Sequence, residues 1–456
     1  MRLRTSITCV LLALALGLSS LPAVAAPPAG GFYGVQLDDS VAELTTLPLA
    51  SAAGIRLLRF NLRWADVESA DSNPPAYNWA LYDRLIGEET AAGFQLIITV
   101  RDNPSWAATT SCGPIDKVPT TRFIAFLSAL VNRYGKPPYN VKLWELYNEP
   151  DNNHPEFAGQ GGCWGQHAAA YAALLSQAQP AIKAADPDAK LVLGGLAYDF
   201  IEGVDAGGIF NRYFLRDLLA SPGGKSFDIM NFHYYRAFHA RWDPYGRDVI
   251  GKTNFIRGQL ISNGAPRPIM VTEIGHPSAG PAGDGQDYSD AASSRYVVQG
   301  LTRGRAADLY AMVWYQMTDV PADPRKYGLL LADHTPKPAY YAYQINTAEL
   351  GAATYLGQEN AAGLETYLFD AGDRQKRVVW SSDDLTHTLT ITATAIWVVD
   401  KLGGRRIISD GGPADQDAAR DGKVTLAIGV EPYYVYPALP ADTPLRVFLP
   451  ALRRGP

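Results

Sequence analysis

The stretch that decides the fold reads Val141-Lys-Leu-Trp-Glu-Leu-Tyr-Asn-Glu-Pro-Asp151. Its apolar run predicts a buried strand, and Pro150 ends that strand because proline cannot donate to a sheet ladder. Glu149 therefore stands at the carboxyl end of the strand. Glu145 shares a face with Glu149 but lies four residues deeper. We expect it to be a buried carboxylate paired with an arginine, because an unpaired buried charge is costly.

A second stretch, Pro268-Ile-Met-Val-Thr-Glu273, has the same form, since apolar residues again lead to a glutamate. Side chains alternate along a strand, so Ile269, Val271 and Glu273 are expected to share the face that points into the sheet's interior. Catalytic groups of a parallel barrel lie at the carboxyl ends of its strands. The pattern therefore predicts that Glu149 and Glu273 meet at one rim.

Around these two strands, short apolar runs alternate with longer amphipathic stretches from about residue 31 to 344. Strands separated by helical segments indicate βαβ units and a parallel sheet. The expected strands are 32–37, 55–61, 95–100, 141–147, 191–194, 227–234, 268–273 and 309–316, and the expected helices include 82–92, 121–134, 166–184, 209–219 and 289–303. Eight strands over this length predict an α/β fold, a (β/α)₈ TIM barrel over 31–345. No glycine-rich phosphate-binding motif supports nucleotide binding.

The sequence pattern changes after residue 345. Short strands separated by turn residues predict a small C-terminal antiparallel β-sandwich over 346–439. The expected strands are 378–380, 388–393, 396–399, 424–428 and 433–436. We favour a sandwich that packs on the barrel over an independent sugar-binding module. The tail 440–456 contains proline and arginine, and its role is unknown.

Two carboxylates at one barrel rim fit the needs of glycoside hydrolysis. One group must be protonated to supply a proton to the leaving oxygen, and the other must be ionised to attack the anomeric carbon or activate water. Alone, Asn148-Glu149-Pro150 could be a turn and Glu273 a cap, but together on two such strands they favour catalysis. An esterase is disfavoured because the chain lacks a GxSxG nucleophile elbow.

The arrangement resembles the retaining glycosidases of clan A, which are (β/α)₈ hydrolases. Their pattern has an Asn-Glu pair ending strand 4, with the glutamate as acid/base, and a nucleophilic glutamate ending strand 7. The resemblance implies that Glu149 is the acid/base and Glu273 the nucleophile. It also implies that Arg59 and Tyr235 support the nucleophile, that His233 belongs to a His-x-Tyr pattern, that Asn148 binds the 2-hydroxyl and that Trp314 lies beneath the sugar in subsite −1.

A barrel followed by a sandwich looks most like glycoside hydrolase family 39, which includes β-xylosidases and α-L-iduronidases, or like family 5 and its neighbours. Family 5 members commonly carry a histidine after strand 3, where this chain reads Val100-Arg-Asp-Asn103. The expected activity is retaining hydrolysis of O-glycosidic bonds in an oligo- or polysaccharide, with no metal or organic cofactor. The alternative is a non-catalytic carbohydrate-binding protein on the same barrel.

The amino terminus predicts secretion. Arg2 and Arg4 precede an apolar run, 7–18, and small residues at 23–25 offer a cleavage site, so 1–25 is read as a signal peptide. No second membrane segment is expected once it is removed. Cys112 and Cys163 then remain, and an oxidising compartment favours a disulfide between them over two unpaired buried thiols.

Composition excludes other classes. The 456 residues carry 40 Lys and Arg against 46 Asp and Glu, a formal net charge of −6. No basic excess is available for phosphates, so a nucleic-acid partner is not expected. With 47% hydrophobic residues the chain is not disordered. Four tryptophans in or near expected loops could either pack or stack on sugars: Trp64, Trp106, Trp164 and Trp242.

Overall fold

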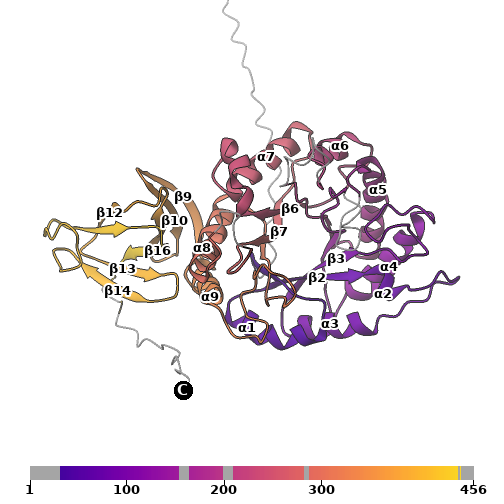
Figure 1. The fold of residues 1–456 in the computed structure, drawn as a ribbon, viewed down its shortest axis with the longest axis horizontal. Coiled ribbons are helices and arrows are strands. Elements are labelled where there is room, and N and C mark those ends of the chain that lie inside the picture. The colour runs from indigo at the N-terminus through magenta and orange to yellow at the C-terminus, as the bar shows by residue number, and fades with distance from the viewer. Residues whose placement is uncertain (1–30, 154–163, 199–208, 282–286, 440–441, 443–456) are drawn as a thin grey trace, which may run out of the picture.

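The computed structural model describes residues 31–153, 164–198, 209–281, 287–439 and 442 (Figure 1). The predicted signal peptide, Cys163 and the tail apart from Asp442 lie outside the described residues. Cys112 is buried.

Eight parallel strands form the barrel. They are β1 (Tyr33–Gln36), β2 (Leu57–Arg63), β3 (Gln95–Arg101), β4 (Leu143–Leu146), β5 (Lys190–Leu193), β6 (Met230–Tyr235), β7 (Ile269–Gly275) and β8 (Met312–Trp314). Their order is β5-β4-β3-β2-β1-β8-β7-β6. Parallel bridges from Val192 to Ile229 and from Leu196 to Phe232 join the two ends of this order. The predicted (β/α)₈ barrel is therefore confirmed.

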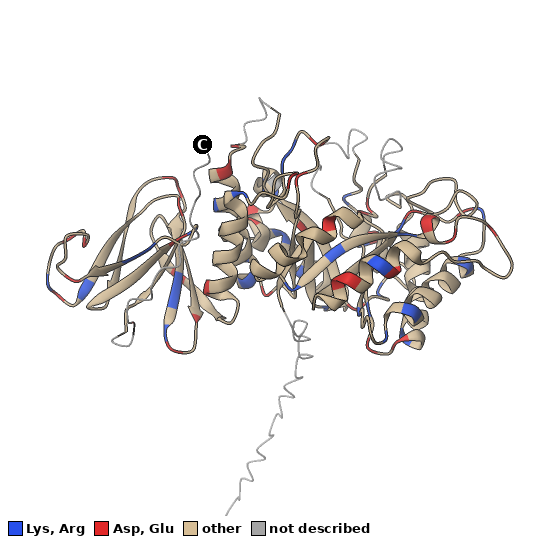
Figure 2. Cartoon of the chain, turned by 90° about the horizontal axis from the view of Figure 1, so that it is seen from below, with Lys and Arg blue, Asp and Glu red and all other residues tan. Residues whose placement is uncertain are grey.

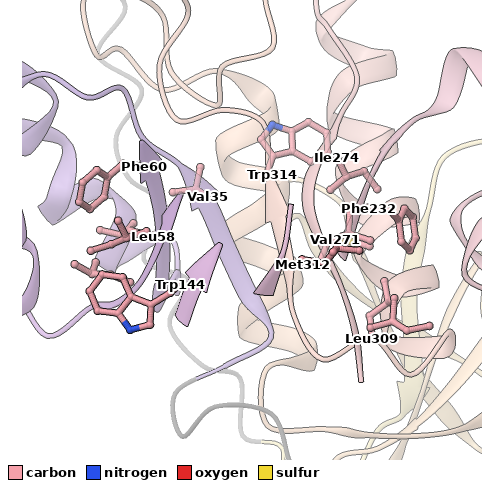
Figure 3. Close-up of a cluster of buried hydrophobic side chains, with 14 of the residues drawn as sticks. Val35, Leu58, Phe60, Trp144, Phe232, Val271, Ile274, Leu309, Met312 and Trp314 are labelled. Carbon is pink, nitrogen blue, oxygen red and sulfur yellow. The ribbon is translucent and has the colours of Figure 1, made fainter. Parts of the chain in front are cut away.

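Helices surround the strands on the outside (Figure 1). They are α1 (Leu47–Ala52), α2 (Trp64–Val67), α3 (Ala80–Ala91), α4 (Thr121–Tyr134), α5 (Ala168–Ala185), α6 (Phe214–Ala220), α7 (Val249–Ser262), α8 (Asp290–Ala306) and α9 (Pro338–Leu350). Outward-facing strand residues such as Leu58, Trp144 and Phe232 belong to the core that these helices cover (Figure 3).

The barrel interior is layered. Its floor is a buried apolar cluster with one residue from nearly every strand, including Leu57, Ile97, Leu143 and Met270. Two residues further along these strands, on the same face, stand the buried polar residues Arg59, Thr99, Glu145 and Thr272. The strand period thus places a polar layer directly above the apolar floor, on the side of the carboxyl ends.

Strand β7 departs from simple alternation. Its pairing with β6 shifts register, because Val271 opposes Phe232 whereas Glu273 opposes His233. Val271 belongs to the outer core and not to the floor, so our expectation that it shares an inward face with Glu273 was wrong. A bulge adds a residue to one strand and re-aims the side chains that follow. Here it brings Glu273 inward beside Thr272.

The C-terminal part forms two antiparallel sheets, as predicted. One has the order β14-β13-β16-β11-β10-β9 and the other pairs β12 with β15. The strands are β9 (Thr354–Ala361), β10 (Leu364–Asp370), β11 (Gln375–Ser381), β12 (His387–Thr392), β13 (Ala395–Asp400), β14 (Arg405–Ser409), β15 (Lys423–Ile428) and β16 (Tyr433–Pro437). Helices α8 and α9 lie between this sandwich and the barrel strands (Figure 1).

Charged residues of both signs are interspersed along barrel and sandwich in the view of Figure 2. Within the described ranges, no helix has the length and apolar character needed to cross a bilayer.

Candidate active site

A cavity of about 310 Å³ opens at the carboxyl ends of the barrel strands. Its lining combines carboxylates, guanidinium groups, amides and phenols: Gln36, Arg59, Asn61, Arg101, Asn148, Glu149, Tyr235, Glu273, Tyr315, Asp323, Arg325 and Tyr327. Five of the residues singled out in the sequence therefore meet in one cavity, although they come from β2, β6, β7 and the turn after β4.

Glu149 and Glu273 face each other with His233 between them. His233 Nδ1 lies 3.0 Å from Glu149 Oε1 and 3.5 Å from Glu273 Oε2. One oxygen from each carboxylate and a nitrogen of His233 all lie within 4.8 Å of one another. Both carboxylates line the cavity, so a single sugar residue can contact them together.

Arg59 is the centre of the polar layer and is almost fully buried. It forms a two-pronged pair with Glu145, with Nε to Oε2 at 2.7 Å and Nη2 to Oε1 at 3.0 Å. The same guanidinium donates to Glu273 Oε1 at 2.9 Å and to Asn148 Oδ1 at 2.7 Å. The expected pairing of Glu145 with an arginine is thus confirmed.

Glu273 is held in its ionised form. Burial alone would raise the pKa of this carboxyl, but the charges of His233 and Arg59 and a hydrogen bond from Tyr235 lower it below its ordinary value. Tyr235 Oη donates to Glu273 Oε2 at 2.7 Å. Conversely, burial and the neighbouring Glu273 charge raise the pKa of Tyr235 well above its ordinary value, so the phenol remains a donor.

His233 is fully buried beside both carboxylates. Burial lowers its pKa, yet the charge of Glu273 and the contact with Glu149 outweigh this and raise the pKa above 6.5. Its Nε2 lies 3.2 Å from Thr272 Oγ1. The ring is therefore fixed between the polar layer and the two glutamates.

The turn that carries Glu149 is strained. Tyr147 and Glu149 have positive φ angles of 60° and 47°, on either side of Asn148. Side chains disfavour this left-handed region, and such residues persist where surrounding contacts over-determine them, typically at functional sites. The backbone N–H of Glu149 donates to Gly195 O at 3.1 Å, and its carbonyl accepts from Asn152 N at 3.0 Å.

Trp314 does not reach the cavity. It is fully buried, its Nε1 donates to Tyr327 O at 3.1 Å, and it lies beside Ile274 in the core (Figure 3). The next residue, Tyr315, lines the cavity instead, in an edge-to-face cluster with Tyr235 and Tyr327. The resemblance to clan A had pointed to Trp314, but at the end of β8 it is Tyr315 whose side chain lines the cavity.

The other tryptophans pack in the core. Trp64, Trp164 and Trp242 are buried, and Trp106 is partly buried with its edge against Trp64. Gln36 was not among the predicted site residues, yet its Oε1 accepts from Arg59 Nη1 at 2.8 Å. The parallel pairing of β1 with β2 places Gln36 directly opposite Arg59.

Glu149, His233 and Glu273 offer ligand atoms of the kind that a metal ion could take. A divalent cation there would lie next to Arg59, whose guanidinium is 2.9 Å from Glu273. Since like charges repel strongly in a buried site, these residues fit a metal poorly.

A parallel barrel whose carboxyl-end cavity holds two facing carboxylates fits the class of (β/α)₈ hydrolases that act on glycosidic bonds. The sequence model of the cellulase family, glycosyl hydrolase family 5, matches residues 31–316. The chain therefore belongs to glycosyl hydrolase family 5, a glycosidase family whose substrates are carbohydrates. Among curated proteins, none matches the sequence.

Solved structures share the fold across both parts of the chain. A family 39 glycoside hydrolase from Bacteroides cellulosilyticus is 20% identical, with a TM-score of 0.65 over 89% of this chain and 80% of that one. A β-xylosidase from Caulobacter crescentus is 16% identical, with a TM-score of 0.60 over 91% and 97% of the two chains. A glucosidase from Croceicoccus marinus is 15% identical, with a TM-score of 0.60 over 91% of this chain and 97% of that one. These structures show the shared fold, and the match to glycosyl hydrolase family 5 confirms the resemblance to clan A.

Proposed function

We propose that the protein hydrolyses O-glycosidic bonds by double displacement, with Glu273 as nucleophile and Glu149 as acid/base. Glu273 attacks the anomeric carbon while Glu149 gives its proton to the departing oxygen. The resulting glycosyl-enzyme ester is then cleaved by a water that Glu149 deprotonates, so the sugar leaves with its original anomeric configuration.

One observation carries this proposal: an oxygen of Glu149 and one of Glu273 lie within 4.8 Å across the same cavity. An inverting enzyme needs roughly 6.5 Å or more between its carboxyl groups to admit a water molecule. The short separation favours direct attack by Glu273. Its lowered pKa supports the same role, because only the ionised carboxylate is a nucleophile.

Two neighbours are proposed to bind the sugar. Arg59 has only donors, so Asn148 must turn its amide oxygen to the guanidinium and can offer its NH₂ group to a 2-hydroxyl. Tyr315, and not Trp314, is proposed to provide the aromatic surface beneath the sugar ring, since it lines the cavity beside Tyr235.

The test is hydrolysis of aryl β-D-glucosides, β-D-xylosides and β-D-cellobiosides and of the corresponding polysaccharides, with the first-formed anomer followed by NMR. Release of the retained anomer supports double displacement. Release of the inverted anomer would contradict it. Binding without turnover of any of these compounds would instead favour the carbohydrate-binding alternative.

The acid limb of the pH profile should respond to Tyr235. The charges of His233 and Arg59 and the Tyr235 hydrogen bond outweigh burial and lower the pKa of Glu273, so the nucleophile stays ionised to a lower pH than an ordinary glutamate and is lost as the pH falls further. Tyr235→Phe removes a hydrogen bond to a charged group, worth about 1.5–3 kcal/mol. We expect kcat/KM to fall about 10- to 100-fold and its acid limb to move to higher pH. Tyr327→Phe removes a cavity hydroxyl that does not contact Glu273, and an equal shift in that control would contradict the account.

The sandwich is proposed to be a structural partner of the barrel. The main apolar core runs without interruption from barrel residues into Tyr367, Trp380 and Tyr434 of the sandwich. Helix α9 crosses position 345, and Tyr343 donates to Gly34 O at 2.9 Å, so we place the boundary after Leu350 and before β9. A chain ending at residue 350 is expected to be insoluble or unstable, and a stable, fully active one would overturn this role.

A buried ion network joins the two parts. Arg303 of α8 donates through Nε and Nη2 to Glu365 of β10 and through Nη1 to Asp248, each at 2.8 Å. Arg303→Met leaves both carboxylates buried without this cation, which costs about 3–5 kcal/mol of unfolding free energy. Thermal and urea unfolding would measure it. Arg84→Met, which breaks an exposed pair with Glu88, should change stability by less than about 0.5 kcal/mol.

We also propose that the protein is secreted through the signal peptide 1–25 and that Cys112 pairs with Cys163. Mass analysis of the secreted protein should give a mature amino terminus near residue 26. Alkylation before and after reduction should reveal two cysteines only after reduction, and free thiols without reduction would contradict the pairing.

A further inference from the structure

Residues 195–198 follow β5 and lie between the turn that carries Glu149 and strand β6. We call this segment the β5 extension. On one side Gly195 O accepts from Glu149 N at 3.1 Å. On the other side Leu196 O accepts from His233 N at 2.9 Å. The segment therefore sets the spacing between the proposed acid/base and its histidine partner.

Asp151 holds the β5 extension from the side of the Glu149 turn. Its carboxylate is fully buried, and its two oxygens accept from Ala197 N at 3.1 Å and from Tyr198 N at 2.9 Å. Asp151 lies two positions after Glu149, so these two hydrogen bonds fix the β5 extension to the turn that carries Glu149. They add to the contacts that keep the left-handed backbone of Glu149 in place.

Lys252 of α7 holds the same segment from the side of β6. It is buried, and its Nζ donates to Ala197 O at 2.5 Å and to His233 O at 2.7 Å. The ammonium also faces the rings of Phe232 and Trp242 at 5.4 and 5.2 Å from their centroids. One cation thus ties the extension to the backbone of the histidine that contacts Glu149.

The charge of Lys252 stabilises the ionised form of Asp151. Burial, reinforced by the charge of Glu149, raises the pKa of Asp151 to about 7, while the Ala197 and Tyr198 amides and Lys252 oppose the rise. Burying a carboxylate costs free energy, and the two backbone hydrogen bonds and the charge of Lys252 offset part of that cost. Neither side chain touches Glu149 Oε1 or Glu273 in the contacts described above. Their contacts with the site are the backbone bonds to the β5 extension and to His233, together with the charge of Asp151 near Glu149.

We propose that Asp151 and Lys252 are positioning residues, which clamp residues 195–198 and thereby hold Glu149 against His233. This inference rests on the proposed acid/base role of Glu149. It differs from that role because it assigns a catalytic consequence to two residues that lie behind the cavity wall.

Asp151→Asn is the decisive variant, because its amide can accept one of the two backbone N–H groups but turns a donor towards the other. If Glu149 loses its position, proton donation to the leaving group weakens. General acid catalysis is worth about 10²–10⁴-fold, and it matters only for leaving groups that need a proton. We expect kcat/KM to fall at least about 10-fold for phenyl glycosides, whereas 2,4-dinitrophenyl glycosides change less than about 2-fold.

Asp186→Asn is the matched control. Asp186 is also a buried aspartate near a lysine, with Lys142 Nζ at 2.6 Å from Oδ2, but this pair lies at the amino end of β4, away from the cavity. Asp186→Asn should lower the melting temperature. Any change in its kcat/KM should be the same for phenyl and 2,4-dinitrophenyl glycosides. If Asp151→Asn behaves in the same way, the positioning role is overturned. Lys252→Met provides a second variant with the same expectation should Asp151→Asn fail to fold.

The failure of this inference and the failure of the proposed function are separable. Glu149→Gln, measured in parallel, must show the leaving-group dependence if Glu149 is the acid. A readout without substrate is the ¹⁵N NMR titration of His233, whose pKa is raised partly by Glu149. We expect its midpoint to fall in Asp151→Asn and to stay unchanged in Asp186→Asn. An unchanged midpoint in both variants would overturn the clamp whatever the role of Glu149.

Discussion

Glu273→Gln should abolish hydrolysis while leaving the fold intact. The amide has nearly the shape of the carboxylate but no charge, so it cannot attack the anomeric carbon. Removing a nucleophile that acts within a catalytic unit costs on the order of 10⁴- to 10⁶-fold in kcat. The measurement is kcat for the best aryl glycoside, with substrate affinity followed by calorimetry in the same variant.

Glu89→Gln is the control for this substitution. Glu89 of α3 is buried as well, and burial raises the pKa of its carboxyl well above the ordinary value, but it lies outside the cavity. We expect wild-type kcat in this variant. Activity that survives in Glu273→Gln within about 10-fold would remove Glu273 from the mechanism, since nucleophile loss costs far more.

Arg59→Met should damage stability and activity together. The guanidinium contacts Glu145, Glu273, Asn148 and Gln36, and its removal leaves two carboxylates buried without their cation. Breaking a buried pair from one side costs about 3–5 kcal/mol of unfolding free energy. Loss of one charged group that stabilises the reacting centre costs about 10²–10³-fold in kcat.

The control for Arg59→Met is Arg133→Met. Arg133 forms a two-pronged pair with Asp83, with distances of 2.7 and 2.6 Å, but this pair is exposed on the helical surface. Its loss should cost less than about 1 kcal/mol, because exposed pairs are screened by water. Urea unfolding compares the two variants directly, and equal losses would contradict the central place given to Arg59.

The sequence predicted the barrel because all eight strands have apolar runs of the expected length separated by helical periodicity. It did not predict β9, β10 or β14. Strand β9 reads Thr-Tyr-Leu-Gly-Gln-Glu-Asn-Ala and is exposed at every second position, so it has little apolar signal. An edge strand of this kind is stabilised by its neighbour and by the barrel helices, and neither is visible in a local pattern.

The candidate site was predicted where strand ends carry polar or charged residues. Arg59, Asn148, Glu149, Tyr235 and Glu273 all line one cavity. The inward direction of Glu273 follows from a register shift in β7, which the two-residue period cannot anticipate. Trp314 was assigned by resemblance to clan A, whereas its neighbour Tyr315 lines the cavity. Asp151 and Lys252 were missed because their partners are backbone groups of other segments, which depend on the closed fold.

Covalent trapping is the most direct test of the central claim. A 2-deoxy-2-fluoro glycoside with a good leaving group, built on the sugar that the enzyme hydrolyses, should form a stable ester because the fluorine slows its breakdown. The account predicts that mass spectrometry of the digested protein finds one sugar on the peptide that contains Glu273, and none in Glu273→Gln. A label on another residue, or full turnover with no trapped ester, would contradict the assignment of Glu273 as the nucleophile.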